Sequence, residues 1–207
     1  MNLIDQLPRV FQANLDRLFQ RVMMPAMDAL TVHPELEHGE ANSIDEFLDR
    51  ASAQVDNYTA NEAAKSFVLT LAAVFERQLS IWARLVRPES AQKRALFQDL
   101  LLACADAADI DLAVGGLGAE LTELILVANV VRHGEGPACE TLRAKAPVLW
   151  SDDTSDYVDL LPGPRVPSEM LRIRRNDLFR YIRATTRFWG RLDPLPVAVA
   201  DPPYWPS

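Results

Sequence analysis

The chain has 207 residues, of which 49% are hydrophobic and 24% are charged, and its formal net charge at pH 7 is -8. This length favours one domain with peripheral additions, and the composition excludes collagen-like, disordered and disulfide-stapled chains. The acidic balance argues against nonspecific binding to nucleic acid, because such binding depends on Lys and Arg neutralising phosphates. Any contact with nucleic acid therefore has to be local.

The sequence contains no recognisable membrane span, export signal or metal site. The longest apolar stretch, Phe67 to Phe75, is interrupted and is too short to span a bilayer. The first residues lack the basic start, apolar run and cleavage site of a secretory signal. The two cysteines have no Cys or His at metal-ligand spacing, and His33 and His38 lie in a polar stretch and are expected to be solvated. We therefore expect a cytoplasmic protein with no membrane contact, metal or cofactor.

Two helical regions are predicted before the first strong helix break. Residues 1–42 are expected to form an N-terminal helical extension, in which residues 10–30 show amphipathic spacing and Pro25 ends or kinks the helix. After a polar stretch, Ser43 and Glu46 offer a capping box for a helix that runs to about residue 58. This helix would open the core bundle, which we place at residues 43–145.

The core bundle is predicted to contain several further helices. Thr59 and Glu62 repeat the capping pattern before a helix that runs to residue 87, and the wide apolar arc of this helix predicts a central position. An Ala- and Leu-rich helix follows over 89–107. The Gly-rich segment 115–118 lacks a preceding strand and a following Lys-Ser/Thr, so it is interpreted as a turn between helices. Helices are then expected over 119–133 and 137–143.

The last quarter of the chain changes in composition. Residues 146–175 are rich in Pro, Asp, Ser and Gly and are predicted to form a loop excursion, in which 157–161 and 171–174 are β-prone and offer a small hairpin. Asn176 would cap the last bundle helix, at residues 176–192, and a Pro-rich tail follows at 193–207. Helices joined by short connections predict a single all-α domain, an antiparallel helical bundle with an irregular or hairpin insertion.

One polar pair lies near the end of the helix predicted at 119–133. Asn129 and His133 are one helical turn apart, so they project from the same side of the helix. A His can move protons near neutral pH, and a neighbouring amide can orient its ring or hold a phosphate oxygen. The alternative is that His133 interacts with the helix terminus and Asn129 satisfies a backbone group.

The stretch from Leu126 to Gly134 resembles the signature helix of HEPN proteins, which are small helical bundles, often dimeric, found in prokaryotic toxin and phage-defence systems and in RNA-processing factors. The family motif is an Arg, then four to six residues, then a His, and a polar residue commonly follows the Arg. Asn129 and His133 fit this frame, and the expected Arg falls on Ala128.

The resemblance implies a homodimer of a bacterial toxin, defence or stress system that cleaves or binds RNA. A catalytic member would use His133 as the acid/base in metal-independent transesterification, with Asn129 orienting it and Arg132 offsetting phosphate charge. Family members often place an acidic or polar residue of an earlier helix opposite the motif, and Glu76 is the candidate, with a surface ion pair as its alternative. The competing hypothesis, favoured by Ala128, is a non-enzymatic interaction module that binds a partner protein.

A band of cations is predicted on the last helix. Seven Arg fall within residues 172–191, where Asp177 is the only acid, so a local positive field is expected. Four of them are spaced by three, four and four residues and share one side of the helix; we call them the arginine stripe and predict that they bind RNA: Arg180, Arg183, Arg187 and Arg191. The alternative is that the arginine stripe pairs with acidic faces of neighbouring helices or with an acidic partner protein.

Overall fold

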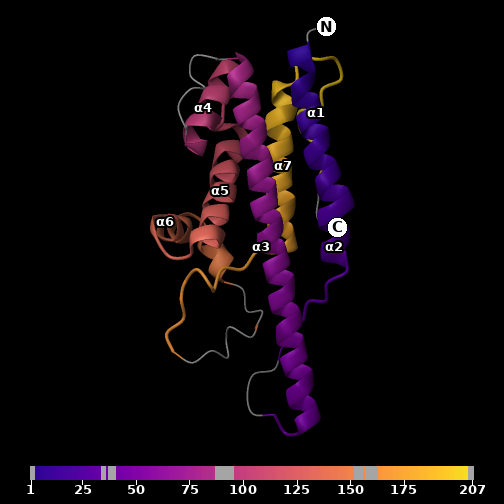
Figure 1. Cartoon of the computed structure of the whole chain (residues 1–207), viewed down its shortest axis with the longest axis vertical. Helices are drawn as coiled ribbons and strands as arrows, with labels where there is room; N and C mark the ends of the chain where they lie inside the picture. Colours follow the sequence, from indigo (N-terminus) through magenta and orange to yellow (C-terminus); the bar gives the residue numbers. More distant parts are fainter. Residues whose placement is uncertain are drawn as a thin grey trace.

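The computed structural model describes residues 3–33, 36, 41–86, 96–151, 156 and 163–204. Within these ranges the chain is helical and contains no strand, which confirms the all-α prediction. Figure 1 shows an elongated bundle in which α1, α3, α5 and α7 follow the long axis, while α4 lies beside the upper part of α3 and α6 lies on the outer side of α5.

The N-terminal helical region begins before the amphipathic segment predicted at residues 10–30 and continues through Pro25. It consists of α1 (Leu3–Leu18), a π-helical turn (Phe19–Met23) and α2 (Met24–Asp28). Proline has no N–H to donate, and its ring crowds the carbonyl four residues earlier. The chain accommodates it in the wide turn, where the Met24 N–H bonds to the Phe19 carbonyl. The predicted break is therefore a local widening of the helix.

The two helices predicted between residues 43 and 87 are one helix, α3 (Ile44–Val86), of 43 residues and therefore about 65 Å long. Its N-terminus is capped largely as predicted, because the Ser43 hydroxyl accepts from the Glu46 N–H at 3.1 Å. The Glu46 carboxylate accepts from the Asn42 N–H at 2.7 Å. The predicted second cap is wrong, since the Thr59 hydroxyl donates to the Val55 carbonyl inside the helix at 2.8 Å.

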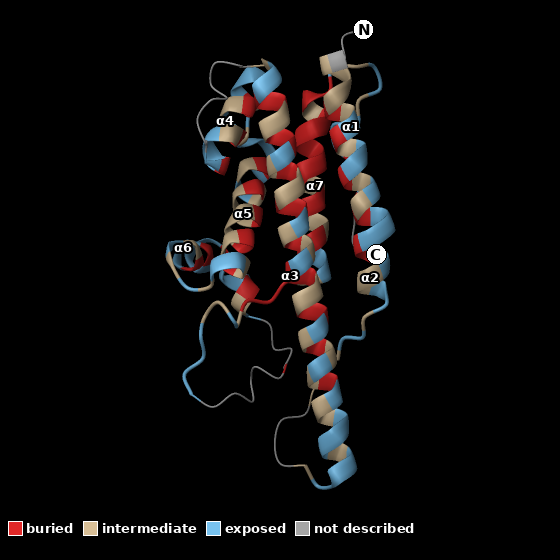
Figure 2. Cartoon of the chain, viewed as in Figure 1, coloured by how far each residue is buried: buried red, intermediate tan, exposed pale blue. Residues whose placement is uncertain are grey.

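The C-terminal helix α7 (Arg175–Leu192) lies at the centre of the bundle, where α1, α3 and α5 pack around it. Figure 2 shows buried residues along nearly its whole length. An aromatic cluster joins it to α1 and α3: ring centroids are 4.9 Å apart for Phe11 and Trp189 and 5.5 Å apart for Phe75 and Phe188. The central position predicted for the α3 segment is thus shared with α7.

The remaining elements are α4 (Phe97–Ala107), a 3-10 turn (Val114–Gly116), α5 (Leu117–His133), α6 (Pro137–Lys145) and a second 3-10 turn (Pro147–Trp150). The helix predicted at 89–107 is confirmed from residue 97, and residues 87–95 lie outside the described residues. The predicted glycine turn is also confirmed. Gly115 and Gly116 both have left-handed φ values, of 66° and 70°, which explains glycine at both positions.

The predicted hairpin is not formed by 171–174, which are extended but unpaired with any strand, and 157–161 lie outside the described residues. Residues 171–173 are all buried, and the backbone of Leu171 and Ile173 bonds to Asn61 of α3 instead of to a strand. Asn176 is not the N-cap of α7, because it lies inside the first turn. The Asp177 carboxylate instead accepts from the Arg174 N–H at 2.9 Å.

The described part of the predicted tail, residues 193–204, packs closely on α1 and α7. A Cβ at Gly190 would lie 2.0 Å from the Val199 carbonyl oxygen, so only glycine permits this approach. The Gln12 side chain donates to the carbonyls of Thr186 and Val199, at 2.9 and 2.7 Å. The Tyr204 hydroxyl donates to Asp16 at 2.6 Å. The tail is therefore an integral part of the bundle.

The Tyr204 contact predicts a loss of stability in alkali. Burial, followed by the carboxylate of Asp16, raises the pKa of the Tyr204 phenol above its ordinary value of about 10. Above that pH the unfolded chain releases the proton while the folded chain retains it, so the stabilisation present at neutral pH is lost as pH rises. Thermal unfolding followed by circular dichroism should show a falling melting temperature above about pH 10. The decline should be shallower in Tyr204→Phe, and equal slopes would contradict this origin.

Candidate functional site

The Asn129–His133 segment forms the last turn of α5. The helix ends where Gly134 adopts a positive φ of 71° and donates its N–H to the Val130 carbonyl at 2.8 Å. Arg132 and His133 are exposed, and Asn129 is half-buried. The segment is therefore an accessible helix end.

Ala128 has a physical explanation in this fold. The residue is only 1% exposed and belongs to the hydrophobic core. An Arg at this position would have to place its charge among apolar side chains, which is costly without a partner. The resemblance to HEPN proteins stays a prediction, and its missing Arg corresponds to a position that this bundle encloses.

Glu76 is half-buried on α3. No hydrogen bond or ion pair between described residues joins it to Asn129, Arg132 or His133. The Ser80 hydroxyl, one turn later on α3, donates to the Glu76 carbonyl at 2.9 Å. The structure thus places the four predicted catalytic residues on α3 and α5 without connecting them. Their proposed cooperation stays a prediction.

The first half of the arginine stripe faces acidic side chains of α5. Arg180 Nη2 lies 2.6 Å from Glu123 Oε1 and 2.9 Å from Asp177 Oδ1. Arg183 Nη2 lies 3.0 Å from Glu120 Oε1. These contacts match the alternative in which the stripe pairs with a neighbouring helix.

The second half of the arginine stripe contacts the glycine turn and the tail. Arg187 is 8% exposed; its Nε lies 2.9 Å from Asp201 Oδ1, and its Nη1 donates to the Gly115 carbonyl at 3.3 Å. Arg191 donates to the Val114 carbonyl at 3.4 Å. All four guanidinium groups are thus engaged within the chain. RNA binding by the stripe stays a prediction that would require these contacts to be exchanged.

Two amide side chains on α3 hold separate segments against its middle, and sequence reasoning did not single them out. Asn57 accepts from the His33 N–H at 2.7 Å and donates to the His33 carbonyl at 2.9 Å. Asn61, one turn later, donates to the Leu171 carbonyl at 3.1 Å and accepts from the Ile173 N–H at 2.9 Å. Each amide therefore pairs with a backbone as a peptide group would.

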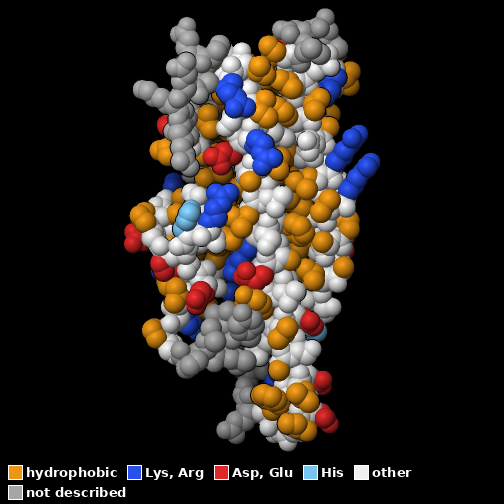
Figure 3. Space-filling model, viewed as in Figure 1, with side chains coloured by type: hydrophobic (Ala, Val, Ile, Leu, Met, Phe, Trp, Pro, Cys, Tyr) orange, Lys and Arg blue, Asp and Glu red, His pale blue; other side chains and the backbone are white. Residues whose placement is uncertain are grey.

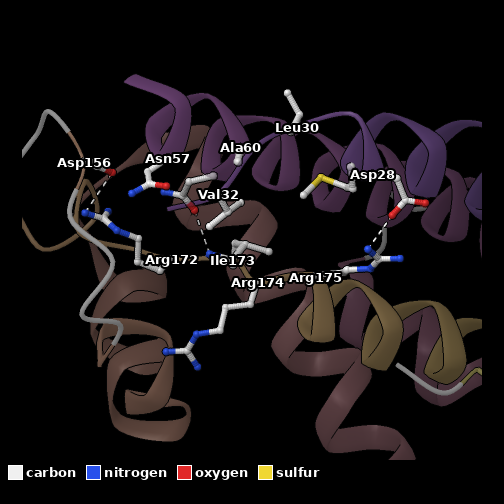
Figure 4. Close-up of a pocket in the computed structure, with 12 residues that line it drawn as sticks. Asp28, Leu30, Val32, Asn57, Ala60, Asp156, Arg172, Ile173, Arg174 and Arg175 are labelled. Carbon is white, nitrogen blue, oxygen red and sulfur yellow. Dashed lines mark hydrogen bonds and ion pairs between the residues drawn. The ribbon is translucent and has the colours of Figure 1, made fainter. Parts of the chain in front are cut away.

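Between these two anchored segments lies a cavity of about 520 Å³, shown in Figure 4. Its inner end holds a buried ion pair in which Arg172 Nη2 is 3.1 Å from Asp156 Oδ2. At the other end Arg175 Nη1 is 2.6 Å from Asp28 Oδ1. Each labelled carboxylate thus has an arginine beside it, and apolar side chains such as Ile173 lie between the two pairs. The arrangement offers a binding space but no nucleophile with an adjacent base.

A different surface feature lies on the N-terminal half of α3. Residues 44–56, here called the arm, project beyond the ends of α1, α5 and α7 (Figure 1). Four large apolar side chains follow one face of the arm at offsets of three, four and eleven residues, which fit a narrow helical stripe. We call them the docking stripe: Ile44, Phe47, Leu48 and Val55, exposed by 71%, 57%, 56% and 52%.

An acidic flank runs beside the docking stripe. Asp45, Asp49 and Asp56 project from one side of it, and the first two are exposed. Figure 3 shows hydrophobic side chains gathered at the lower end of the molecule with acidic side chains along their edge. The opposite face of this half of α3 is buried at Ala53 and Asn57. The arm is thus anchored on one side and leaves an acid-bordered apolar stripe on the other.

Among the described residues, the segment Val114–His133 has the length and apolar composition of a membrane-crossing helix. In the bundle it contains α5, whose residues Leu117, Leu121 and Leu124 are fully buried in the core. The core helix of a bundle has the same composition, so this feature carries no functional argument. The part of the chain that the structure describes also contains no cluster of three His, Cys, Asp or Glu suited to a metal ion.

Comparisons with known proteins add no relative to this picture. No family model, no curated protein and no solved structure matches the chain. The functional argument therefore depends on the geometry of the chain itself.

Proposed function

We propose that the protein is a non-enzymatic protein–protein interaction module, and that its docking stripe receives an amphipathic helix of another protein. The docking stripe carries this proposal, because four large apolar side chains are exposed along one face of a projecting helix. Full burial of each such side chain contributes about 1.5–3 kcal/mol. Because each of the four side chains is already partly covered, a partner that covers the stripe gains only the remaining part of each contribution, less the cost of association.

The shape of the docking stripe favours a helical partner. The four side chains recur at helical spacing on a straight, anchored helix, so a second helix can pack its own ridge of side chains beside them. Recognition by an amphipathic helix uses anchors at the same three- and four-residue spacing. A flat or irregular partner would match fewer of these positions.

The charges beside the docking stripe favour a different protein over a second copy of this chain. In an antiparallel two-fold pair of arms, each flank meets the same flank of the other copy. Asp45, Asp49 and Asp56 would then face three identical carboxylates. Such like charges repel, and little compensating positive charge is present on the arm, where Arg50 is the only base.

Several observations favour this function over RNA cleavage. Ala128 is buried where HEPN proteins carry an Arg, and Glu76 is not joined to His133. The arginine stripe is engaged with carboxylates and carbonyls of the same chain. An RNA-binding surface needs cations that can neutralise phosphates.

The proposal predicts a specific crosslink from the arm. A photoreactive amino acid at Phe47 of the full-length protein should give one heterologous protein adduct in cells that naturally contain it, whereas the same group at exposed Leu102 on α4 should not. The adduct is identified by mass spectrometry and the partner purified. Leu48→Ser should weaken its binding about tenfold or more, equivalent to about 1.4 kcal/mol, and Leu102→Ser should leave it unchanged.

Three results would overturn the proposal. The adduct could consist only of this chain, as measured by its mass, or the purified partner could bind Leu48→Ser as tightly as the unaltered protein. Metal-independent cleavage of labelled RNA that is lost in His133→Ala would instead establish the enzymatic alternative.

A further inference from the structure

On the basis of the proposed docking, we infer that the partner helix carries Lys or Arg along one side, and that one of these side chains enters a groove beside the arm. The inference concerns the chemistry of the partner, whereas the proposed function concerns only the apolar contact. Three observations carry it: the groove, the charges around it and its position next to the docking stripe.

The groove is a hollow of about 420 Å³ between the arm and the residues His33 and Leu36. Asp49 and Asp56 contribute carboxylates to its lining, Arg50 contributes one cation, and Ser52 and Ala53 contribute small side chains. A long, thin side chain with a charged end fits such a space better than a bulky apolar one, because its methylene stem can lie along Ala53 while its charge remains near solvent.

The charge around the groove is negative. Residues 43–59 include four acids and one base, Arg50, and the guanidinium of Arg50 pairs with Glu46 on the preceding turn. Asp56 Oδ2 lies 3.1 Å from His33 Nε2. No described Lys or Arg forms an ion pair with Asp45 or Asp49. A cation of the partner therefore meets carboxylates that no Lys or Arg of the described residues pairs with.

The groove and the docking stripe are arranged so that one helix can use both. On the helical wheel Asp45, Ser52 and Asp56 follow Leu48 on the side that leads to the groove. A helix packed along the stripe extends its flanking side chains over this side, as the residues bordering a coiled-coil seam do. Opposite charges at these positions set the choice and orientation of the partner.

The test uses the full-length protein and two fluorescent helical peptides of equal length that share one Leu/Ile stripe. One peptide carries Lys at the flanking positions and the other Gln. Fluorescence anisotropy should give the Lys peptide about tenfold higher affinity at low salt, with the difference shrinking as salt screens the charges. Asp49→Asn with Asp56→Asn should remove this preference, whereas Asp106→Asn, at an exposed position on α4, should retain it.

The outcomes separate this inference from the proposed function. Equal binding of both peptides, with both lost in Leu48→Ser, would overturn the cationic partner and leave apolar docking in place. A Lys preference that persists in the double variant of Asp49 and Asp56 would assign it to another acidic surface and would also overturn the inference. Failure of the Lys peptide to bind has the same consequence, while the crosslink from Phe47 still decides the proposed function. The melting temperature of each aspartate and leucine variant is measured as a control and should remain close to that of the unaltered protein if the variant is folded.

Discussion

Replacing Trp189 with alanine is expected to lower the free energy of unfolding by about 3–5 kcal/mol. Trp189 is fully buried at the centre of the bundle, where its ring packs edge-to-face against Phe11 of α1 and Phe188 of α7. Removal leaves a cavity between helices from both ends of the chain, and rigid neighbours close such a cavity only in part. Urea unfolding followed by circular dichroism measures the loss.

Trp189→Phe provides the matched control. The indole N–H of Trp189 has no hydrogen-bond acceptor in the described part of the chain, so phenylalanine gives up packing volume but no hydrogen bond. The loss should be less than about half of that in the alanine variant. A smaller effect of alanine than of phenylalanine would contradict the central role of this ring.

Glu123→Ala is expected to cost about 2–3 kcal/mol, because one carboxylate oxygen serves two partners. Glu123 Oε1 accepts from the Tyr181 hydroxyl at 2.7 Å and pairs with Arg180 at 2.6 Å. Tyr181 is fully buried, and burial, followed by the charge of Glu123, raises the pKa of its phenol well above the ordinary value. Without the acceptor the hydroxyl remains desolvated and unpaired, which is the costly case for a buried polar group.

Glu120→Ala is the control for this prediction. Glu120 lies one turn earlier on α5 and pairs with Arg183 at 3.0 Å, but no buried hydroxyl depends on it. Its replacement should cost within about 1 kcal/mol, the range of a partly exposed ion pair. Similar losses in both variants, measured by urea unfolding, would show that the Tyr181 hydrogen bond contributes little.

The sequence predicted the helical class and most helix positions, because apolar periodicity and glycine turns are local signals. The predictions of helix starts and breaks were wrong where tertiary packing outweighs a local capping or proline signal. Thr59 and Glu62 have the spacing of a capping box, yet the helix continues through them, and the Thr59 hydroxyl bonds to the Val55 carbonyl of the preceding turn. Pro25 likewise suggested that the helix ends or kinks, but the helical chain continues past this residue through one wide π-helical turn at Phe19–Met23.

The arginine stripe illustrates why a correct pattern did not determine a function. The spacing of Arg180, Arg183, Arg187 and Arg191 is visible in the sequence and is preserved in α7. Whether these arginines are free to bind RNA or pair within the chain depends on Glu120 and Glu123. These two acids lie about 60 residues earlier and contact the stripe only after α5 packs on α7. The relative rotation of two helices in a bundle cannot be read from either helix alone.

The apolar spacing of the docking stripe is visible in the sequence, but its exposure to solvent is not. Ile44, Phe47 and Leu48 have the spacing of an ordinary core-facing helix, and nothing local shows that the bundle ends before it reaches them. The neighbouring Asp45 and Asp49 were the local signal in the sequence that this face borders solvent. Whether an apolar face is covered depends on the lengths of the neighbouring helices, which the structure supplies.

The packing of α1 against α7 ties the two ends of the chain together during synthesis. When α1 leaves the ribosome, the apolar side chains of Phe11, Leu15 and Phe19 have no lasting cover, because the central helix α7 is translated long after α1. At elongation rates of about 5–20 residues per second, this interval is roughly 10 to 30 seconds. The nascent chain thus exposes apolar side chains of α1 during this interval, and the native packing of the bundle becomes available only after α7 has been translated.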